Sequence, residues 1–296
     1  MKIVLLGAQG QVGWEVAKLA RTQGLKLIAF DRNHLDVTDA IKTYQVLLEQ
    51  QPHIVINCTA YTAVDKAESE PELAYRVNRN AVGIMAKACA HLGIPLLHLS
   101  TDYVFNGEAH LPYCEDEATK PLGVYGLSKW EGEEQLRALH KQHIIVRTSW
   151  VFGVHGHNFV KTILRLGRER EQLKIVADQM GCPTAARDIA GGLLHIARVA
   201  VQGNMFWGTY HFCGEPAVTW YDFAKIIIEY ANILTSLRVK TILPITTQEY
   251  PTPARRPHYS VLNTDKIKKT FSIQMPDWRV TLKQIIEELV DETLLS

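Results

Sequence analysis

Short apolar runs alternate with amphipathic stretches throughout the first half of the chain. Continuously apolar runs are typical of strands that are covered on both faces of a parallel sheet. Helical periodicity fills the intervals, and right-handed strand–helix–strand crossovers then build a doubly wound, Rossmann-type α/β sheet. The pattern predicts strands at residues 2–6, 26–30, 53–57, 95–99 and 143–147, and helices at residues 11–22, 39–51, 72–92 and 124–140.

The alternation loosens after about residue 150, where segments rich in proline and glycine separate the helical stretches. We expect helices at residues 187–199 and 220–230, and a strand at residues 209–213 that returns to the sheet. The chain should therefore form two domains. The predicted division is a dinucleotide-binding domain of residues 1–150 plus about 185–213, and a smaller substrate-binding domain of about 151–184 and 214–296.

Composition and charge narrow the class of protein. Hydrophobic residues make up 47% and charged residues 21% of the 296 residues, which is ordinary for a globular enzyme. The formal net charge of +1 gives no electrostatic reason to expect a nucleic acid or an anionic membrane as partner. Five scattered cysteines, no C-x-x-C pair, and no signal peptide or long apolar run together predict a cytoplasmic protein with reduced thiols.

Glycines 7, 10 and 13 lie where the first predicted strand gives way to the first helix. Glycines at such a position permit a tight turn, a close approach of backbone to a pyrophosphate, and close packing of helix on strand. The amides and the positive dipole end of the helix N-terminus also favour an anion there. This motif predicts a dinucleotide site that includes Gly7, Gly10 and Gly13.

The end of the second strand bears on the choice of cofactor. Asp31 could accept a hydrogen bond from the adenosine ribose, which favours NADH, whereas Arg32 could hold a 2′-phosphate, which favours NADPH. NADPH and NADH therefore both stay open. Asp36 and Val37 follow in a loop that could meet the adenine edge, although Asp36 or Thr38 could instead cap the next helix.

Tyr125 and Lys129 lie four residues apart on a predicted helix, and hence on one face of it. A phenol with an ordinary pKa of about 10 is a poor acid at neutral pH, and a nearby ammonium should lower that pKa by about 2 units. Thr101 follows the fourth strand, at the sheet edge where ligands of doubly wound folds bind. We expect Thr101, Tyr125 and Lys129 to reduce a carbonyl beside a nicotinamide, with Tyr125 and Lys129 also contacting the cofactor and Lys129 holding its ribose.

These motifs resemble the extended short-chain dehydrogenase/reductase group, and within it the dTDP-4-dehydrorhamnose reductase family, nearly from end to end. Cys58, Thr59 and Cys182 are small departures from the usual pattern of that family. The similar segments are GAQGQVG at 7–13, FDRNHLDVTD at 30–39, NCTAYTAVDKAE at 57–68, LSTDYVFNG at 99–107, PLGVYGLSKWEGE at 121–133, RTSWVFG at 147–153, DQMGCPT at 178–184 and RRPHYSVLN at 255–263.

The resemblance implies reduction of the C4 keto group of dTDP-4-dehydro-L-rhamnose to dTDP-L-rhamnose with NADPH or NADH, by a monomer or a homodimer. It implies Thr101, Tyr125 and Lys129 as catalytic residues, and it adds Gln11, Val12, Ala60 and Tyr61 to the cofactor site, with Asp31, Asp36 and Val37. On the substrate side it implies Tyr103, Trp150, Asn158, Gln179, Thr184 and Arg256 together with Thr101.

Some members of the family bridge a dimer through Mg²⁺ held by acidic side chains. Glu15 matches one such ligand and Asp188 lies near another, but a lone glutamate on a helix is usually solvated, so we predict no metal site. Two other functions remain. One is an epimerase or dehydratase for another nucleotide-sugar, although Asp102-Tyr103 replaces the Asp-Glu pair of dehydratases. The other is a non-catalytic dinucleotide-binding regulatory subunit.

Overall fold

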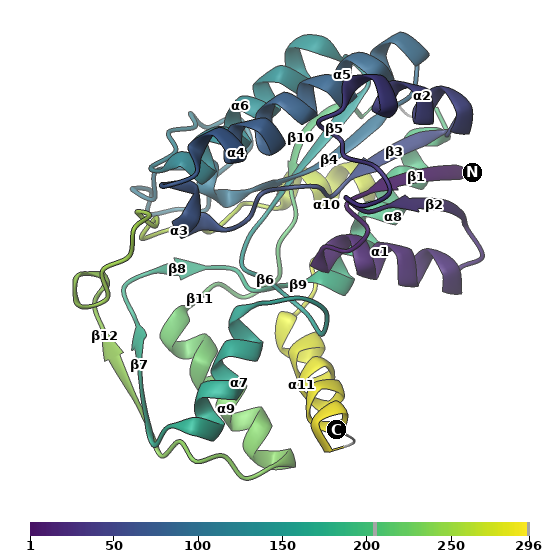
Figure 1. The fold of residues 1–296 in the computed structure, drawn as a ribbon. Helices are drawn as coiled ribbons and strands as arrows, with labels where there is room; N and C mark the ends of the chain where they lie inside the picture. Colours follow the sequence, from purple (N-terminus) through teal and green to yellow (C-terminus); the bar gives the residue numbers. More distant parts are fainter. Residues whose placement is uncertain (204–205, 295–296) are drawn as a thin grey trace.

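A six-stranded parallel sheet forms the centre of the computed structural model, which describes residues 1–203 and 206–294 (Figure 1). The strand order β10-β5-β4-β3-β1-β2 doubles back on itself at β1 and β3, as in doubly wound folds. This confirms the predicted fold class. The strands are β1 (Lys2–Leu6), β2 (Lys26–Phe30), β3 (Ile54–Asn57), β4 (Leu96–Thr101), β5 (His143–Thr148) and β10 (Gly208–His211).

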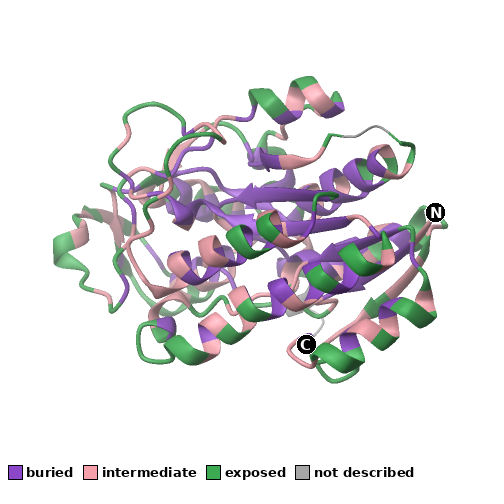
Figure 2. Ribbon diagram, turned by 90° about the horizontal axis from the view of Figure 1, so that it is seen from above, coloured by how far each residue is buried: buried purple, intermediate pink, exposed green. Residues whose placement is uncertain are grey.

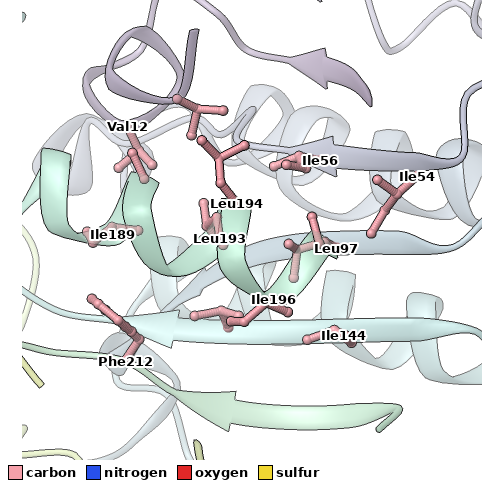
Figure 3. Close-up of a cluster of buried hydrophobic side chains, with 14 of the residues drawn as sticks. Val12, Ile54, Ile56, Leu97, Ile144, Ile189, Leu193, Leu194, Ile196 and Phe212 are labelled. Atoms are coloured by element: carbon pink, nitrogen blue, oxygen red, sulfur yellow. The ribbon is translucent and has the colours of Figure 1, made fainter. Parts of the chain in front are cut away.

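Helices cover both faces of this sheet, so its inner strands are buried, whereas the edge strand β2 is only partly covered and the outer faces of the helices are exposed (Figure 2). Alternate residues of β1 serve the two faces: Ile3 and Leu5 pack with α1 (Gln11–Thr22) and α8 (Ala186–Val201). Figure 3 shows Leu193, Leu194 and Ile196 of α8 lying over the strands. Val4 and Leu6 of β1 pack on the other face, which is covered by α2 (Ala40–Gln50), α5 (Ala81–Leu92) and α6 (Val124–Leu139).

The helix predicted at residues 72–92 is confirmed, because the chain is helical from Pro71 to Leu92, but it contains a π-helical turn that was not predicted. It consists of α4 (Pro71–Tyr75), the π-helical turn η1 (Arg76–Asn80) and α5. The π turn places the buried Asn78 side chain inward, where it accepts from Tyr61 N at 2.8 Å and donates to Ser128 Oγ at 3.0 Å. Gly132 of α6 packs so closely here that an added Cβ would lie 2.0 Å from the Asn78 carbonyl oxygen. Tertiary packing thus accompanies this π turn.

A smaller lobe lies below the sheet in the view of Figure 1 and has an apolar cluster of its own. Phe152, Phe223 and Trp278 are fully buried in it. A parallel pair of strands, which the sequence pattern did not predict, flanks the helices. The lobe contains α7 (Phe159–Glu169), α9 (Trp220–Leu234), α11 (Trp278–Leu294), β7 (Gln172–Val176) and β12 (Thr241–Ile245).

Short strand pairs join the two lobes: β6 (Val151–Phe152) with β9 (Thr184–Ala185), and β8 (Met180–Gly181) with β11 (Val218–Thr219). The short helix α10 (Asp265–Phe271) packs Ile267 and Phe271 into the core of the sheet. The predicted division into domains stays a prediction, but α10 falls in the range assigned to the smaller domain and packs with the larger lobe. The remaining short helices are α3 (Val64–Ala67), η2 (Asp102–Val104) and η3 (Thr247–Glu249). No helix within the described residues could cross a membrane.

Candidate functional site

A cleft opens at the carboxyl ends of β1, β2 and β3, with a volume of about 290 Å³. Gly7 turns the chain there with a φ of 85°, and an added Cβ on Gly7 would lie 2.8 Å from the Cys58 backbone. Gly13 in the first turn of α1 lies so close to Gly7 that its Cβ would meet the Gly7 carbonyl oxygen at 2.1 Å. Since only glycine leaves these spaces open, the turn presents bare backbone to the cleft.

Eight of the thirteen predicted cofactor residues line this cleft, and five do not. Tyr125 and Lys129 are two of these five and lie beside β4 instead. Val12 is in the apolar core, Gly13 packs on Gly7, and the Gln11 side chain accepts a hydrogen bond from Asn158 at 3.0 Å. The eight that line it are Gly7, Gly10, Asp31, Arg32, Asp36, Val37, Ala60 and Tyr61.

Sequence reasoning missed other residues of the cleft, which come from four separate segments. Gln9 lies inside the glycine motif itself and could have been included. Arg76 carried no signal, because the π turn that points it at the cleft depends on the packing of Asn78. The missed residues are Gln9, Leu35, Thr38, Cys58, Thr59, Leu73, Arg76 and Val77.

The Asp31 carboxylate accepts four hydrogen bonds at the mouth of the cleft. Gln9 Nε2 donates at 2.6 Å, and the Asn33 and His34 amides donate at 2.9 and 3.0 Å. His34 Nδ1 lies 2.7 Å from the carboxylate, and this contact is the main reason that the pKa of Asp31 is lowered. The protein thus already occupies the oxygens that could bind a ribose.

Two arginines bring positive charge to the same cleft. Arg32 and Arg76 both line it and both act on Asp36, whose pKa is lowered first by the Thr38 amide and hydroxyl and then by these charges. Asp36 does not cap the next helix, because Asp39 does so by accepting from Lys42 N at 3.0 Å. A phosphate at the cleft would therefore meet two guanidinium groups.

The structure brings the hydroxyls of Thr101 and Tyr125 together at the end of β4. Burial raises the pKa of Tyr125 to about 12, and a hydrogen bond with Thr101 opposes that rise. Thr101 Oγ also donates to Asp102 Oδ1 at 3.0 Å and accepts from Tyr103 N at 3.2 Å. Burial raises the pKa of Asp102 to about 6, so the carboxyl that Thr101 contacts has a pKa close to neutral pH.

Lys129 lies one helical turn from Tyr125, and its Nζ donates to Leu99 O at 2.8 Å. The expected net lowering of the pKa of Tyr125 is not met, because burial of the phenol raises that pKa. Burial lowers the pKa of Lys129 itself to about 8, and the Glu133 carboxylate opposes this. Lys129 is only 2% exposed, which is why desolvation dominates.

Tyr103, Trp150 and Arg256 are three of the predicted substrate residues. The Tyr103 ring meets the Tyr125 ring edge to face, with centroids 5.5 Å apart. Trp150 has a φ of 45° and stacks on Trp220 at 3.4 Å between centroids, so one of its faces is already used. Arg256 forms a two-pronged pair with Asp65, at 3.1 and 2.8 Å, and its charge reaches Tyr103.

The other three predicted substrate residues are engaged with the protein. Gln179 donates to Thr247 Oγ at 3.0 Å and is nearly buried. Asn158 caps α7 by accepting from Lys161 N at 3.1 Å. Thr184 is fully buried, and its hydroxyl donates to Cys182 O at 3.0 Å and accepts from Gly214 N at 3.2 Å.

The acidic residues considered for Mg²⁺ do not form a fitting site. The described residues contain no group of three or more His, Cys, Asp or Glu side chains that could hold a metal ion. Glu15 is buried beside Arg187, whose guanidinium pairs with Glu288 at 2.7 Å, and Asp188 accepts from Thr281 at 2.9 Å. An arginine thus already supplies the positive charge.

Three comparisons with known proteins cover nearly all of the chain. Residues 1–291 match the family model described as the RmlD substrate binding domain. The dTDP-4-dehydrorhamnose reductase of Escherichia coli strain K12 is 42% identical over 300 aligned residues that span 100% of both chains. A crystal structure of dTDP-4-dehydrorhamnose reductase from Bacillus anthracis in complex with NADP is 38% identical, has a TM-score of 0.90, and shares 97% of this chain and 100% of its own.

Structures of more distant sugar-nucleotide enzymes share the fold alone. UDP-glucose 4-epimerase of Thermotoga maritima with UDP-glucose has a TM-score of 0.79 at 18% identity, over 99% of this chain and 100% of its own. The architecture is therefore common to reductases and epimerases, and only the site residues and the full-length relatives distinguish between them.

Proposed function

Because this chain belongs to the dTDP-4-dehydrorhamnose reductase family, we propose that it reduces the C4 keto group of dTDP-4-dehydro-L-rhamnose to dTDP-L-rhamnose in the cytoplasm, using NADPH or NADH. The relatives that share its full length carry that name, and one of them is described with NADP bound. The observation that carries the proposal is the meeting of the Thr101 and Tyr125 hydroxyls beside a glycine-walled cleft.

The cofactor, when bound, supplies the hydride that reduces the carbonyl carbon. Tyr125 donates its proton to the oxygen that becomes the alcohol, and Thr101 holds that oxygen by a hydrogen bond. The burial that raises the pKa of Tyr125 to about 12 keeps the phenol protonated until the substrate oxygen becomes basic. Lys129, whose pKa is lowered to about 8, is close enough to neutrality to exchange a proton during turnover.

The cofactor would lie across the glycine turn, with its pyrophosphate on the amides at the start of α1. Arg32 and Arg76 would hold the 2′-phosphate of NADPH, since both line the cleft and Asp31 is occupied by protein donors. Gln11, Val12 and Gly13 would shape the turn from behind, because they pack on the protein. Ala60, Tyr61 and Val37 would form the wall beside the adenosine.

The sugar nucleotide would lie between the lobes, against Tyr103 and the partly exposed Trp150. Arg256, held by Asp65, would meet the diphosphate. Gln179 would offer its side-chain oxygen, whereas Asn158 would act indirectly, by holding the start of α7 through its bonds with Gly153 O and Lys161 N. Thr184 would act indirectly, by holding the loop at Cys182 in place through its fully used hydroxyl.

One assay tests this function. Purified protein, dTDP-4-dehydro-L-rhamnose and NADPH are mixed, the loss of absorbance of the reduced nicotinamide is followed, and the product is identified as dTDP-L-rhamnose by chromatography and NMR. A protein that binds NADPH tightly without oxidising it would instead be a binding subunit. Conversion of the sugar without net oxidation of NADPH would indicate an epimerase.

A further inference from the structure

Three buried polar side chains form a line behind the catalytic end of β4. Asn57 and His98 are 0% exposed and Lys129 is 2% exposed. The parallel register pairs Asn57 of β3 directly with His98 of β4, and both side chains point to the sheet face that α6 covers. The line runs from Asn57 Nδ2 to His98 Nδ1 at 2.9 Å, and from His98 Nε2 to Lys129 Nζ at 3.4 Å.

The contacts of Asn57 determine which nitrogen of His98 carries hydrogen. Asn57 Oδ1 accepts from the Thr59 amide at 2.9 Å and from the Thr59 hydroxyl at 2.6 Å, and the amide can only donate. This assigns the Asn57 oxygen to Thr59 and turns its NH₂ group toward His98 Nδ1. His98 Nδ1 must then accept. Burial lowers the pKa of His98 well below its ordinary value, so the ring is neutral and its single hydrogen is on Nε2.

That hydrogen points toward Lys129 Nζ. A neutral lysine amine has a lone pair that can accept it, whereas a charged ammonium has only hydrogens to present. Within the described residues, Leu99 O at 2.8 Å is the one acceptor within hydrogen-bonding distance of Nζ. The orientation of His98 therefore disfavours the charged form of Lys129.

We propose that His98, held in one tautomer by Asn57, is a positioning residue that biases Lys129 toward its neutral amine and so sets the pH range in which the reductase turns over. The inference rests on the proposed function for its kinetic consequence, though not for the tautomer. It gives a role to a buried histidine that touches neither the cleft nor the reacting hydroxyls.

The other groups around Lys129 do not substitute for His98. The Cys58 thiol faces it from the end of β3, but burial raises the pKa of that thiol to about 12, so it stays neutral. Glu133 on α6 favours the charged form of Lys129, yet it is paired with Arg147 at 2.7 Å. Burial and the Nε2 hydrogen of His98 both favour the neutral amine of Lys129. Of these two effects, only that of His98 can be reversed by changing a hydrogen bond.

The tautomer can be measured without activity. In the native protein with ¹⁵N-labelled histidine, we expect the ring of His98, assigned by its loss in the H98F variant, to show hydrogen on Nε2 and none on Nδ1. Asn57→Asp keeps the oxygen that Thr59 needs and offers a second oxygen to His98 Nδ1, so the hydrogen should move to Nδ1. A native ring with hydrogen on Nδ1 overturns the proposal.

The kinetic test is a cycle of N57D, H98F and the double variant, each followed as kcat against pH. Lys129 acts in its charged form below its pKa, so a raised pKa moves the basic limb of the profile upward. N57D should move that limb up by about one pH unit, a usual shift for one hydrogen-bonding change at a buried amine. In the H98F background N57D should move it by less than half as much.

An equal shift with and without His98 contradicts the proposal, because the aspartate charge would then act directly. His140→Leu is the matched structural control: it removes a buried ring that contacts Ile94 O at 2.9 Å, near the start of β4. It should lower the melting temperature and leave the pH profile unchanged. If the native protein does not reduce the sugar nucleotide, the proposed function fails, and the NMR result alone decides the tautomer.

Discussion

The proposed cofactor cleft and the end of β4, which we propose as the catalytic end, lie at the same edge of one sheet, but they are built differently. The cleft is formed by glycines and exposed charges, and its close backbone contacts join Gly7 to Gly13 and to Cys58. The catalytic end is a packed polar layer in which Thr101, Lys129 and Glu133 are nearly or fully buried. The cleft depends on glycines, which have no side chain, whereas the packed polar layer depends on buried side chains that form hydrogen bonds and ion pairs with one another.

This difference predicts which changes each region tolerates. In the cleft, an added methyl group should be destabilising where two backbone segments lie close together. The loss of a charged side chain there should change the preference between NADPH and NADH. In the polar layer, every removed partner leaves a buried group without compensation, so the cost in stability or rate should be larger. Five substitutions, taken from the largest expected effect to the smallest, test the contrast.

Glu133→Gln should lower the free energy of unfolding by about 3–5 kcal/mol, because it leaves the buried Arg147 guanidinium without its carboxylate. Glu133 and Arg147 are fully buried and 2.7 Å apart. Urea denaturation at neutral pH measures the change. The exposed pair of Arg137 and Glu134 is the control, and Glu134→Gln should cost less than about 1 kcal/mol.

The same pair predicts a pH dependence. Burial alone would raise the pKa of Glu133, but Arg147 and Arg137 overcome it and lower that pKa to about 2. A lowered carboxyl pKa stabilises the fold above its ordinary value and loses that contribution as the pH falls toward 2. The native protein should therefore lose stability between about pH 4.5 and 2 more steeply than the E133Q variant. Parallel pH curves would contradict the buried pair.

Tyr125→Phe should lower kcat by about 100-fold or more, the usual effect of removing a general acid. The ring and its edge-to-face contact with Tyr103 remain, so the KM for NADPH should change by less than about twofold. Steady-state kinetics with the sugar nucleotide measures both. A near-normal kcat would remove Tyr125 from the chemistry.

Gly13→Ala should lower the free energy of unfolding by about 1–3 kcal/mol and weaken NADPH binding, because the new methyl meets the Gly7 carbonyl oxygen. Alanine is otherwise the better helix former, so a loss of stability identifies the clash. Gly10→Ala is the matched control, since its Cβ would lie 3.4 Å from the same oxygen at a φ of −72°. Equal effects at the two positions would break the argument from close backbone.

Arg32→Ala and Arg76→Ala should each lower the ratio of kcat/KM for NADPH over NADH by about tenfold, since a charge-assisted hydrogen bond contributes roughly 1.5–3 kcal/mol. Arg79→Ala is the control: Arg79 lies in the same π turn but pairs with Glu131 at 2.8 Å. An unchanged ratio in R76A would mean that Arg76 does not meet the 2′-phosphate.

The extent to which sequence predicted this structure follows the same contrast. The bounds of β1, β2 and α1 agree with the pattern, because strand hydrophobicity and the glycine turn act over a few residues. The π-helical turn η1 and the pairing of β7 with β12 were not predicted, because each depends on packing against distant segments. The same reason explains why Arg76 was missed in the cleft.

The sequence by itself determined the parallel sheet, the dinucleotide turn, and the choice of Thr101, Tyr125 and Lys129, because periodicity and motif spacing are local properties of the chain. Only the tertiary structure decided what surrounds them. The register of β3 on β4 places Asn57 beside His98, and burial lowers the pKa of Lys129. Desolvation and hydrogen-bond direction arise when strands far apart in sequence pack together, so no local pattern contains them.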